Sequence, residues 1–250
     1  MSRKILGIIP ARFASTRFPG KPLVSIMGKP MIQVVYEAVK KCESFSEVVV
    51  ATDDQQIFAT VESFGGKAVL TSDQHKSGTD RCAEVVKTLS EQFDYVVNIQ
   101  GDEPSIQSSQ IETLLLGFNN PDTQICTLAK KINNAADLLN PNVVKVVFSP
   151  EANALYFSRS PIPYARGIDQ KDWTNNHTYY KHIGLYAYKT SVLLKIASYD
   201  EGILEKTESL EQLRWLEKGI AISVLKTNIE NTGIDTPADL DAYIKQLNNA

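Results

Sequence analysis

The fold is decided by the stretch Ile5-Leu6-Gly7-Ile8-Ile9-Pro10-Ala11-Arg12-Phe13-Ala14-Ser15-Thr16-Arg17-Phe18-Pro19-Gly20-Lys21-Pro22-Leu23. Its apolar start, which stops at Pro10, is typical of a buried strand. The loop that follows carries Arg12, Arg17 and Lys21, and it can surround a polyphosphate with backbone N–H groups and positive charges. A solvated basic loop is the alternative interpretation. The position directly after a buried strand, with Pro and Gly fixing the path, favours phosphate binding.

Apolar strands alternate with helical patterns through the first part of the chain. After the opening strand, the pattern predicts strands over 47–51, 68–70 and 95–99 and helices over 30–41, 55–64, 81–92 and 108–118. Each strand is a nearly continuous apolar run, which predicts a parallel sheet covered by helices on both faces. Site residues of such folds gather at the carboxyl ends of the strands, where Pro10–Arg12, Asp53 and Gln100–Asp102 fall.

The alternation weakens after about residue 121. Strands are predicted over 125–129, 143–148, 154–157, 182–188 and 221–225, and helices over 191–197, over 207–217 and from Pro237 onward. The polar stretch 160–178 is predicted to be a loop or lid. We therefore expect a single domain over 1–250, with a nucleotide half at about 1–120 and an acceptor and dimer half at about 121–250.

Composition and charge exclude several classes of protein. The chain is 43% hydrophobic and 22% charged, as in an ordinary globular protein, and its formal charge of −3 argues against a general nucleic-acid binder. No apolar run approaches the ~20 residues of a membrane span, and the start lacks a signal-peptide pattern, so a cytoplasmic location without membrane partners is expected. The three cysteines lack disulfide or zinc spacing and are expected to be buried apolar residues: Cys42, Cys82 and Cys126.

Two carboxylates could complete a phosphate site. The chain has no G-x-x-x-x-G-K-[ST] loop, and no G-x-G-x-x-G follows the opening strand, which argues against a P-loop kinase and an ordinary dehydrogenase. Asp102 follows a predicted strand and Asp235 precedes the last predicted helix, so each could be no more than a helix cap. If the two converge on a triphosphate, they suit Mg²⁺.

A resemblance narrows these alternatives. The chain resembles the 3-deoxy-D-manno-octulosonate (Kdo) cytidylyltransferases, or CMP-Kdo synthetases, over essentially its full length. The motifs that carry it are the opening loop, Val50-Ala51-Thr52-Asp53, Ser77-Gly78-Thr79-Asp80-Arg81, Asn98-Ile99-Gln100-Gly101-Asp102-Glu103-Pro104, Asn140-Pro141-Asn142-Val143-Val144-Lys145-Val146, Leu155-Tyr156-Phe157-Ser158-Arg159, His182-Ile183-Gly184-Leu185-Tyr186, Leu210-Glu211-Gln212-Leu213-Arg214 and Asp235-Thr236-Pro237. The opening loop by itself indicates only the wider sugar nucleotidyltransferase group.

The resemblance implies a Rossmann-like nucleotidyltransferase fold of the α/β class, with a mixed, mostly parallel sheet. It also implies a homodimer that uses CTP, Kdo and Mg²⁺ in lipopolysaccharide biosynthesis. By matching position, Arg12 and Lys21 would hold the phosphates, Arg17 would lie close to the reacting centre, and Asp102 and Asp235 would bind the metal. The cytosine and ribose would lie against Pro10, Ala11, Ser77, Gly78, Thr79, Arg81 and Gln100.

The same resemblance places the acceptor sugar against Gln100, Arg159, His182, Tyr186, Glu211 and Gln212. Arg159 would bind the sugar carboxylate and the others its hydroxyls. Structural alternatives exist: Tyr186 can be a core residue, His182 a strand histidine, and the glutamates near 208–211, on one helical face with Gln212 and Trp215, can pair with Arg214 or Lys218. The segments 204–209 and 160–178 depart from the family pattern, and both lie in the acceptor half, so other sugar acids stay open as acceptors.

The predicted reaction is CTP + Kdo → CMP-Kdo + diphosphate. The anomeric hydroxyl would attack the α-phosphorus in line with the leaving diphosphate, and catalysis would rest on positioning and charge neutralisation. The alternatives are a cytidylyltransferase for a sialic acid or an amino-substituted Kdo, an enzyme for a hexose 1-phosphate, and a non-catalytic nucleotide-sensing module.

Overall fold

The structure, a computed structural model, describes residues 3–14 and 18–249. The chain divides into two compact units that interleave in the sequence. Unit 1 comprises residues up to 112 together with 189–197 and 231–250, and unit 2 comprises 113–188 and 198–230. The expected boundary near residue 120 lies close to the first crossing. The pattern did not predict that two later segments return to unit 1.

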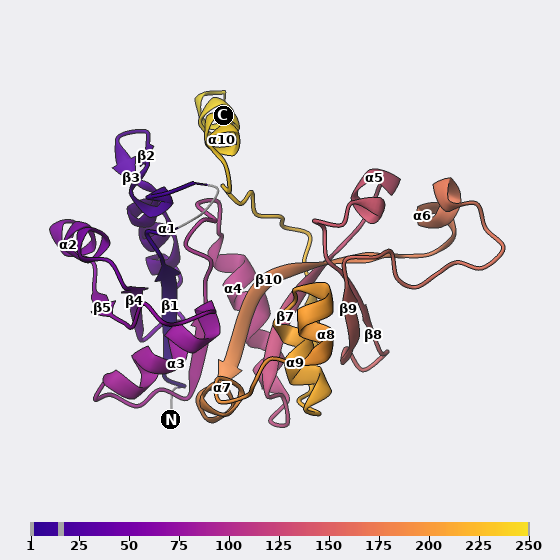
Figure 1. The fold of residues 1–250 in the computed structure, drawn as a ribbon, viewed down its shortest axis with the longest axis horizontal. Helices are drawn as coiled ribbons and strands as arrows, with labels where there is room; N and C mark the ends of the chain where they lie inside the picture. Colours follow the sequence, from indigo (N-terminus) through magenta and orange to yellow (C-terminus); the bar gives the residue numbers. More distant parts are fainter. Residues whose placement is uncertain (1–2, 15–17, 250) are drawn as a thin grey trace. The chain divides into compact units, whose positions relative to one another are not determined.

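Unit 1 is built on four parallel strands in the order β6-β1-β4-β5. The strands are β1 (Ile5–Ala11), β4 (Glu47–Thr52), β5 (Ala68–Leu70) and β6 (Tyr95–Asn98), and β1, β4 and β5 lie side by side in Figure 1. Val50, at the centre of β4, is fully buried. The parallel pairing brings the carboxyl ends of β1, β4 and β6 to one edge, as the apolar runs predict.

The helices of unit 1 lie near their predicted positions, but the one predicted to start at Arg81 begins three residues earlier, at Gly78. They are α1 (Met31–Lys40), α2 (Gln55–Ser63), α3 (Gly78–Thr88), α7 (Thr190–Ile196) and α10 (Pro237–Asn248), and α4 (Ser108–Leu115) crosses the boundary between the units. The Asp54 carboxylate accepts from two backbone N–H groups at the start of α2, and Ser77 forms a capping box with Asp80. A short hairpin of β2 (Ser25–Ile26) and β3 (Lys29–Pro30) precedes α1.

Unit 2 contains a mixed set of strands in the order β11-β7-β10-β8-β9. The strands are β7 (Ile125–Lys131), β8 (Lys145–Phe148), β9 (Ala154–Ser158), β10 (Tyr180–Lys189) and β11 (Ile222–Lys226). β11 is parallel to β7, and the other pairs are antiparallel; β8 and β9 form the hairpin drawn in Figure 1. The fold is thus α/β, with both parallel and antiparallel pairing.

Two sequence predictions for unit 2 are wrong. The helix expected over 207–217 is two helices, α8 (Ile203–Glu208) and α9 (Gln212–Glu217), because Ser209 has a left-handed backbone with φ of 52°. Glu208 therefore does not share one helical face with Glu211, Gln212 and Trp215, as the spacing had predicted.

The stretch 160–178 is not an unpacked loop throughout. It contains a 3₁₀ turn (Gln170–Asp172) and α6 (Trp173–Asn176), and Trp173 is buried against Ile132, Leu138 and Tyr179. Leu138 lies on the short helix α5 (Ala135–Leu139). The large aromatic side chain of Trp173 packs this segment against unit 2 although most of its residues are polar. The overall polarity of the stretch therefore gave the wrong prediction.

Candidate active site

The loop after β1 is closed by its own backbone. The Gly20 N–H donates to the Phe13 carbonyl at 3.0 Å, and Gly20 has a left-handed φ of 68°, which favours glycine. A 3₁₀ turn (Lys21–Leu23) follows and directs Lys21 into the site. Residues 15–17 lie outside the described residues, so the role of Arg17 near the reacting centre stays a prediction.

A cavity of about 230 Å³ lies at the carboxyl ends of β1 and β6 in unit 1. Its lining comprises Pro10, Ala11, Arg12, Ala14, Lys21, Pro22, Gln100, Gly101 and Asp102. A Cβ atom on Gly101 would lie 2.8 Å from the Pro10 carbonyl oxygen, so only glycine allows the two loops to approach this closely. The structure therefore brings together six residues predicted for nucleotide or metal binding.

Lys21 lies between the two carboxylates predicted to bind the metal. Its Nζ is 2.5 Å from Asp102 Oδ2 and 3.1 Å from Asp235 Oδ1, although these residues are 81 and 214 positions away. Neither aspartate is the helix cap that the sequence left open. Thr236 caps α10, and α4 begins only at Ser108, six positions beyond Asp102. The two carboxylates therefore converge on one cation, here the lysine ammonium.

This pair of carboxylates fits a magnesium ion. The ammonium of Lys21 stands where a cation is attracted by two carboxylate oxygens, and Mg²⁺ in nucleotide enzymes commonly uses one or two carboxylates with phosphate oxygens and waters. Among the residues that the structure describes, no cluster of three or more His, Cys, Asp or Glu side chains could hold a metal by itself. An ion at this place would thus depend on the nucleotide for further ligands.

Arg12 presents an unused donor in the same cavity. Its Nη2 is buried, and no hydrogen-bond partner for it lies in the described part of the chain. Burial lowers the pKa of the guanidinium, Arg81 lowers it further, and Asp53 and Asp80 act in the opposite direction. Because a buried donor without a partner is costly, an anionic ligand at this guanidinium is favoured.

The predicted cytosine-binding turn divides into two groups. Ser77 and Gly78 start α3, and a Cβ on Gly78 would lie 3.5 Å from the Pro10 ring, so this glycine faces the cavity wall. Thr79 and Arg81 are buried, at 1% and 0% exposure. Arg81 donates to Thr71 Oγ1 and, at 2.9 Å, to Asp53 Oδ2. The buried Arg81 guanidinium thus bonds residues of the protein, Thr71 and Asp53, next to the turn 77–79. Direct contact between Arg81 and a nucleotide stays a prediction.

The predicted acceptor residues of β10 lie in an aromatic cluster of unit 2. The rings of His182 and Tyr186 are 5.2 Å apart, and Trp215 packs edge-on against Tyr186 at 5.2 Å. The register of β10 against β7 shifts between Ile183 and Tyr186, and Thr127 Oγ1 lies 2.9 Å from His182 Nε2 within this irregularity. His182 and Tyr186 are four positions apart on β10, and the register shift falls between them.

Burial keeps both of these side chains neutral. It lowers the pKa of His182 to about 3 and raises that of Tyr186 well above its usual range, and Glu211 adds to the second shift. Glu211 precedes α9, and Gln212, at 6% exposure, begins it. Unit 2 thus brings His182, Tyr186 and Glu211 into one neighbourhood. The predicted contact of Gln100, in unit 1, with the acceptor stays a prediction.

Arg159 is held by carbonyl groups, which leave its charge in place. Its guanidinium donates to the carbonyls of Glu208 at 2.7 Å, Pro141 at 3.1 Å and Ser209 at 3.3 Å. The Glu208 carboxylate instead accepts from Ser158 Oγ and from the Arg159 backbone N–H. A guanidinium has five N–H groups, so three bonds leave two donors, which suffice for a carboxylate.

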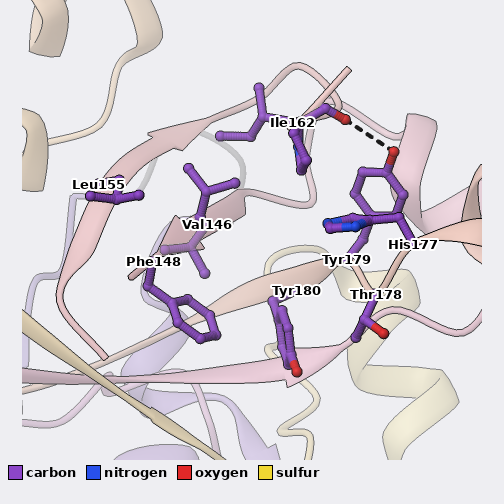
Figure 2. Close-up of a pocket in the computed structure, with 10 residues that line it drawn as sticks. Val146, Phe148, Leu155, Ile162, His177, Thr178, Tyr179 and Tyr180 are labelled. Carbon is purple, nitrogen blue, oxygen red and sulfur yellow. Dashed lines mark hydrogen bonds between the residues drawn. The ribbon is translucent and has the colours of Figure 1, made fainter. Parts of the chain in front are cut away.

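An apolar pocket of about 420 Å³ in unit 2 was not predicted from the sequence. Figure 2 shows its lining, which comprises Val146, Val147, Phe148, Leu155, Ile162, Pro163, His177, Thr178, Tyr179 and Tyr180. The Tyr179 hydroxyl donates to the Pro163 carbonyl at 3.0 Å at one end. Leu155 is 63% exposed. The sequence carries little signal for this pocket, because the run Ala154-Leu155-Tyr156-Phe157 is continuously apolar and does not alternate.

A further residue, Glu103, was quoted in a motif but given no role. Its pKa is raised to about 7, mainly by burial and also by Asp102, while a hydrogen bond from Asn231 acts in the opposite direction. Such a carboxyl beside a predicted metal ligand is a signal that only the folded chain reveals.

Among the helices of the described residues, none has the length and apolarity that crossing a membrane requires.

A parallel α/β unit with a cationic cavity and two convergent carboxylates suits a nucleotidyltransferase, the class that the comparisons with known proteins show. The family model described as "Cytidylyltransferase" matches residues 6–224. The chain is 54% identical over 237 residues to the 3-deoxy-manno-octulosonate cytidylyltransferase of Cytophaga hutchinsonii (94% of each chain) and 55% identical over 249 residues to that of Bacteroides thetaiotaomicron (98% and 99%). A solved CMP:2-keto-3-deoxy-manno-octonic acid synthetase complexed with CTP superposes with a TM-score of 0.91 at 43% identity. The match covers 98% of this chain and 99% of the solved one.

The chain belongs to the family of 3-deoxy-manno-octulosonate cytidylyltransferases. The resemblance read from the motifs and the predicted nucleotidyltransferase fold are both confirmed.

Proposed function

We propose that the protein transfers CMP from CTP to the anomeric hydroxyl of Kdo, giving CMP-Kdo and diphosphate for lipopolysaccharide biosynthesis in the cytoplasm. The observation that carries the proposal is the convergence of Asp102 and Asp235 on Lys21, at a cavity that Lys21, Asp102 and Arg12 line. A sialic acid, an amino-substituted Kdo or a sensing role is not favoured, because the relatives that match over nearly the full chain bear the Kdo name.

The residues of unit 1 would bind the triphosphate by charge. Arg12 offers a buried N–H donor to a phosphate oxygen, and Lys21 can exchange its carboxylate partners for phosphate oxygens when the nucleotide arrives. Asp102 and Asp235, freed from the ammonium, would hold Mg²⁺. The bound ion supplies positive charge that orients the α-phosphate and lowers the cost of charge on the leaving diphosphate.

The residues of unit 2 would bind the sugar acid by shape and hydrogen bonding. The remaining N–H groups of Arg159 match a carboxylate, and neutral His182 and Tyr186 can bind hydroxyls without adding charge. Gln212 and Glu211 lie at the start of α9 beside this cluster. No side chain is assigned as a general base, so orientation of the anomeric hydroxyl and charge neutralisation at phosphorus account for the rate.

The homodimer implied by the resemblance is part of the same proposal. The exposed Leu155 and the apolar pocket beside it offer a surface that a second copy could cover. Light scattering coupled to size exclusion should give twice the chain mass of 27.7 kDa, and Leu155→Glu should shift the population toward monomer. A monomeric wild-type protein at all concentrations tested would refute this part alone.

A substrate panel tests the proposed reaction. Diphosphate release from CTP and Mg²⁺ is measured with Kdo, an amino-substituted Kdo and a sialic acid at equal concentrations. Kdo should give the highest kcat/KM. Equal or faster release with another acid would reassign the acceptor, and calorimetric binding of CTP without release for any acid would support the sensing role.

A further inference from the structure

The segment 231–235 (hereafter the return segment) carries Asp235 but has no regular secondary structure of its own. Thr232 and Gly233 are exposed, and Ile234 is fully buried. The position of the Asp235 carboxylate therefore depends on the bonds that fix this short piece of chain. The residues on both sides of these bonds belong to unit 1.

Three hydrogen bonds join the return segment to the segment 102–105, which carries Asp102. The Ile234 N–H donates to the Asp102 carbonyl at 2.9 Å, the Thr232 N–H donates to Ser105 Oγ at 2.9 Å, and Asn231 Nδ2 donates to Glu103 Oε2 at 2.6 Å. The Ile234–Asp102 and Thr232–Ser105 bonds run in opposite directions along the two segments, so the two metal-binding candidates lie at the same end of the pairing. The Asn231–Glu103 bond departs from that order and joins the start of the return segment to the residue next to Asp102.

The side of Asp235 that faces α10 is fixed separately. The Asp239 carboxylate in the first turn of α10 accepts from the Asp235 N–H at 3.1 Å and from the Thr236 N–H at 2.8 Å. The first turn of α10 thus fixes the backbone of Asp235 and Thr236. The three bonds to the segment 102–105 fix the residues before Asp235.

Of those three bonds, only the one from Asn231 to Glu103 has side chains on both partners. The other two use a backbone N–H, which any residue except proline supplies. The Asn231–Glu103 bond therefore depends most on residue identity, and it joins residues 128 positions apart. It ties the start of the return segment to the residue that follows Asp102.

We propose that Asn231 and Glu103 are positioning residues, whose bond holds the Asp235 carboxylate beside that of Asp102. The inference rests on the proposed function in so far as those two carboxylates bind a divalent cation. Neither positioning residue needs to touch the ion or the nucleotide. Loss of the bond should therefore weaken metal binding and leave the phosphate contacts of Arg12 and Lys21 intact.

The test uses calorimetric titration of the whole protein with CTP, once with Mn²⁺ and once with EDTA. The ratio of the two dissociation constants gives the metal-dependent gain in CTP affinity. Asn231→Leu and Glu103→Leu should lower this gain by about 10-fold, the lower limit for loss of a group that orients a metal ligand, without changing CTP affinity in EDTA. Glu103→Gln keeps a carbonyl oxygen as acceptor and should retain most of the gain.

Hydrogen exchange of the return segment supplies a second readout that does not involve the metal. In Asn231→Leu and Glu103→Leu the amides of residues 232–235 should exchange faster, and the β1 amides should not. The exposed Asn248→Leu on α10 is the matched control and should change neither readout. Wild-type metal-dependent gain in both leucine variants would overturn the inference, whatever the exchange rates.

Asp235→Ala separates this inference from the proposed function. If Asp235→Ala removes the gain while the two leucine variants keep it, the metal site stands and the positioning role is wrong. If Asp235→Ala itself keeps the full gain, the metal assignment is wrong and the inference falls with it.

Discussion

In unit 1 the candidate site is made of loops at the ends of parallel strands, whereas in unit 2 it is built into strand β10 and helix α9. The residues of the first are charged and partly exposed: Lys21 is 13% exposed in its side chain, Asp102 29% and Asp235 45%. In the second, the rings of His182 and Tyr186 are held neutral, as their pKa shifts show, and Arg159 is the charged residue predicted to bind the acceptor.

The difference teaches how each site should respond to change. A site made of charges on loops can lose its function without losing the fold, because few packing contacts depend on those charges. A site built from buried rings shares its residues with the core, so the same substitution affects both function and stability. Each prediction below tests one side of this comparison.

The largest effect is expected for the carboxylates of unit 1. Asp102→Ala and Asp235→Ala should each lower kcat/KM by about 10³-fold, because positive charge at the phosphates would no longer be held in place. The melting temperature should change by only a few degrees. Asp241→Ala, exposed on α10, is the control. Wild-type turnover in the double variant would remove the metal assignment.

The core side of the comparison is tested at Trp215. This residue is 1% exposed and packs edge-on against both Tyr186 and Tyr188. Trp215→Ala should lower the free energy of unfolding by about 3–5 kcal/mol, measured by urea denaturation. Leu116→Ala, 58% exposed in the same unit, should cost far less. A loss below about 1 kcal/mol at Trp215 would contradict the account of a packed acceptor cluster.

Removal of the Lys21 charge should weaken the use of CTP but strengthen the binding of Mg²⁺. Lys21→Met should raise the KM for CTP about 10- to 100-fold, as expected for loss of a charged hydrogen bond. Without nucleotide it should instead strengthen Mg²⁺ binding, because the ammonium no longer competes for Asp102 and Asp235. Steady-state kinetics and metal titration measure the two effects, with the exposed Lys29→Met as control. Weaker metal binding in the nucleotide-free variant would refute the competition.

The smallest effect is a pH dependence of stability from His182. Its pKa is lowered to about 3 in the folded protein from 6.5, so between these values the unfolded chain binds the extra proton. This contribution is complete above pH 6.5 and is lost as the pH falls toward 3, by at most about 1.4 kcal/mol per pH unit.

His182→Gln should therefore reduce the fall in melting temperature between pH 7.5 and 5. The exposed His177→Gln is the matched control and should keep the wild-type fall. An unchanged fall in His182→Gln would mean that the ring is not held neutral by burial.

The sequence predicted local features well because local chemistry determines them. The apolar runs located β1, β4 and β6, and Asp54 marked the start of α2. The edge position of Asp102 followed from parallel pairing. These features depend on residues close together in the chain.

The features that the sequence did not predict depend on distant residues or on single backbone angles. The left-handed Ser209 splits the helix expected over 207–217, and Trp173 anchors a segment that looked unpacked. Lys21 meets Asp235 across 214 positions, and Asn231 meets Glu103 across 128. Neither pairing has a local pattern from which it could be inferred.

The central claim, CMP transfer to Kdo, is tested most directly by ³¹P NMR of CTP, Kdo and Mg²⁺ with the protein. We predict that the CTP signals give way to one phosphodiester signal of CMP-Kdo and one of diphosphate, formed in equal amounts, and that omission of Kdo stops both. Unchanged CTP signals in the complete mixture, or diphosphate formed without a new phosphodiester, would contradict the account.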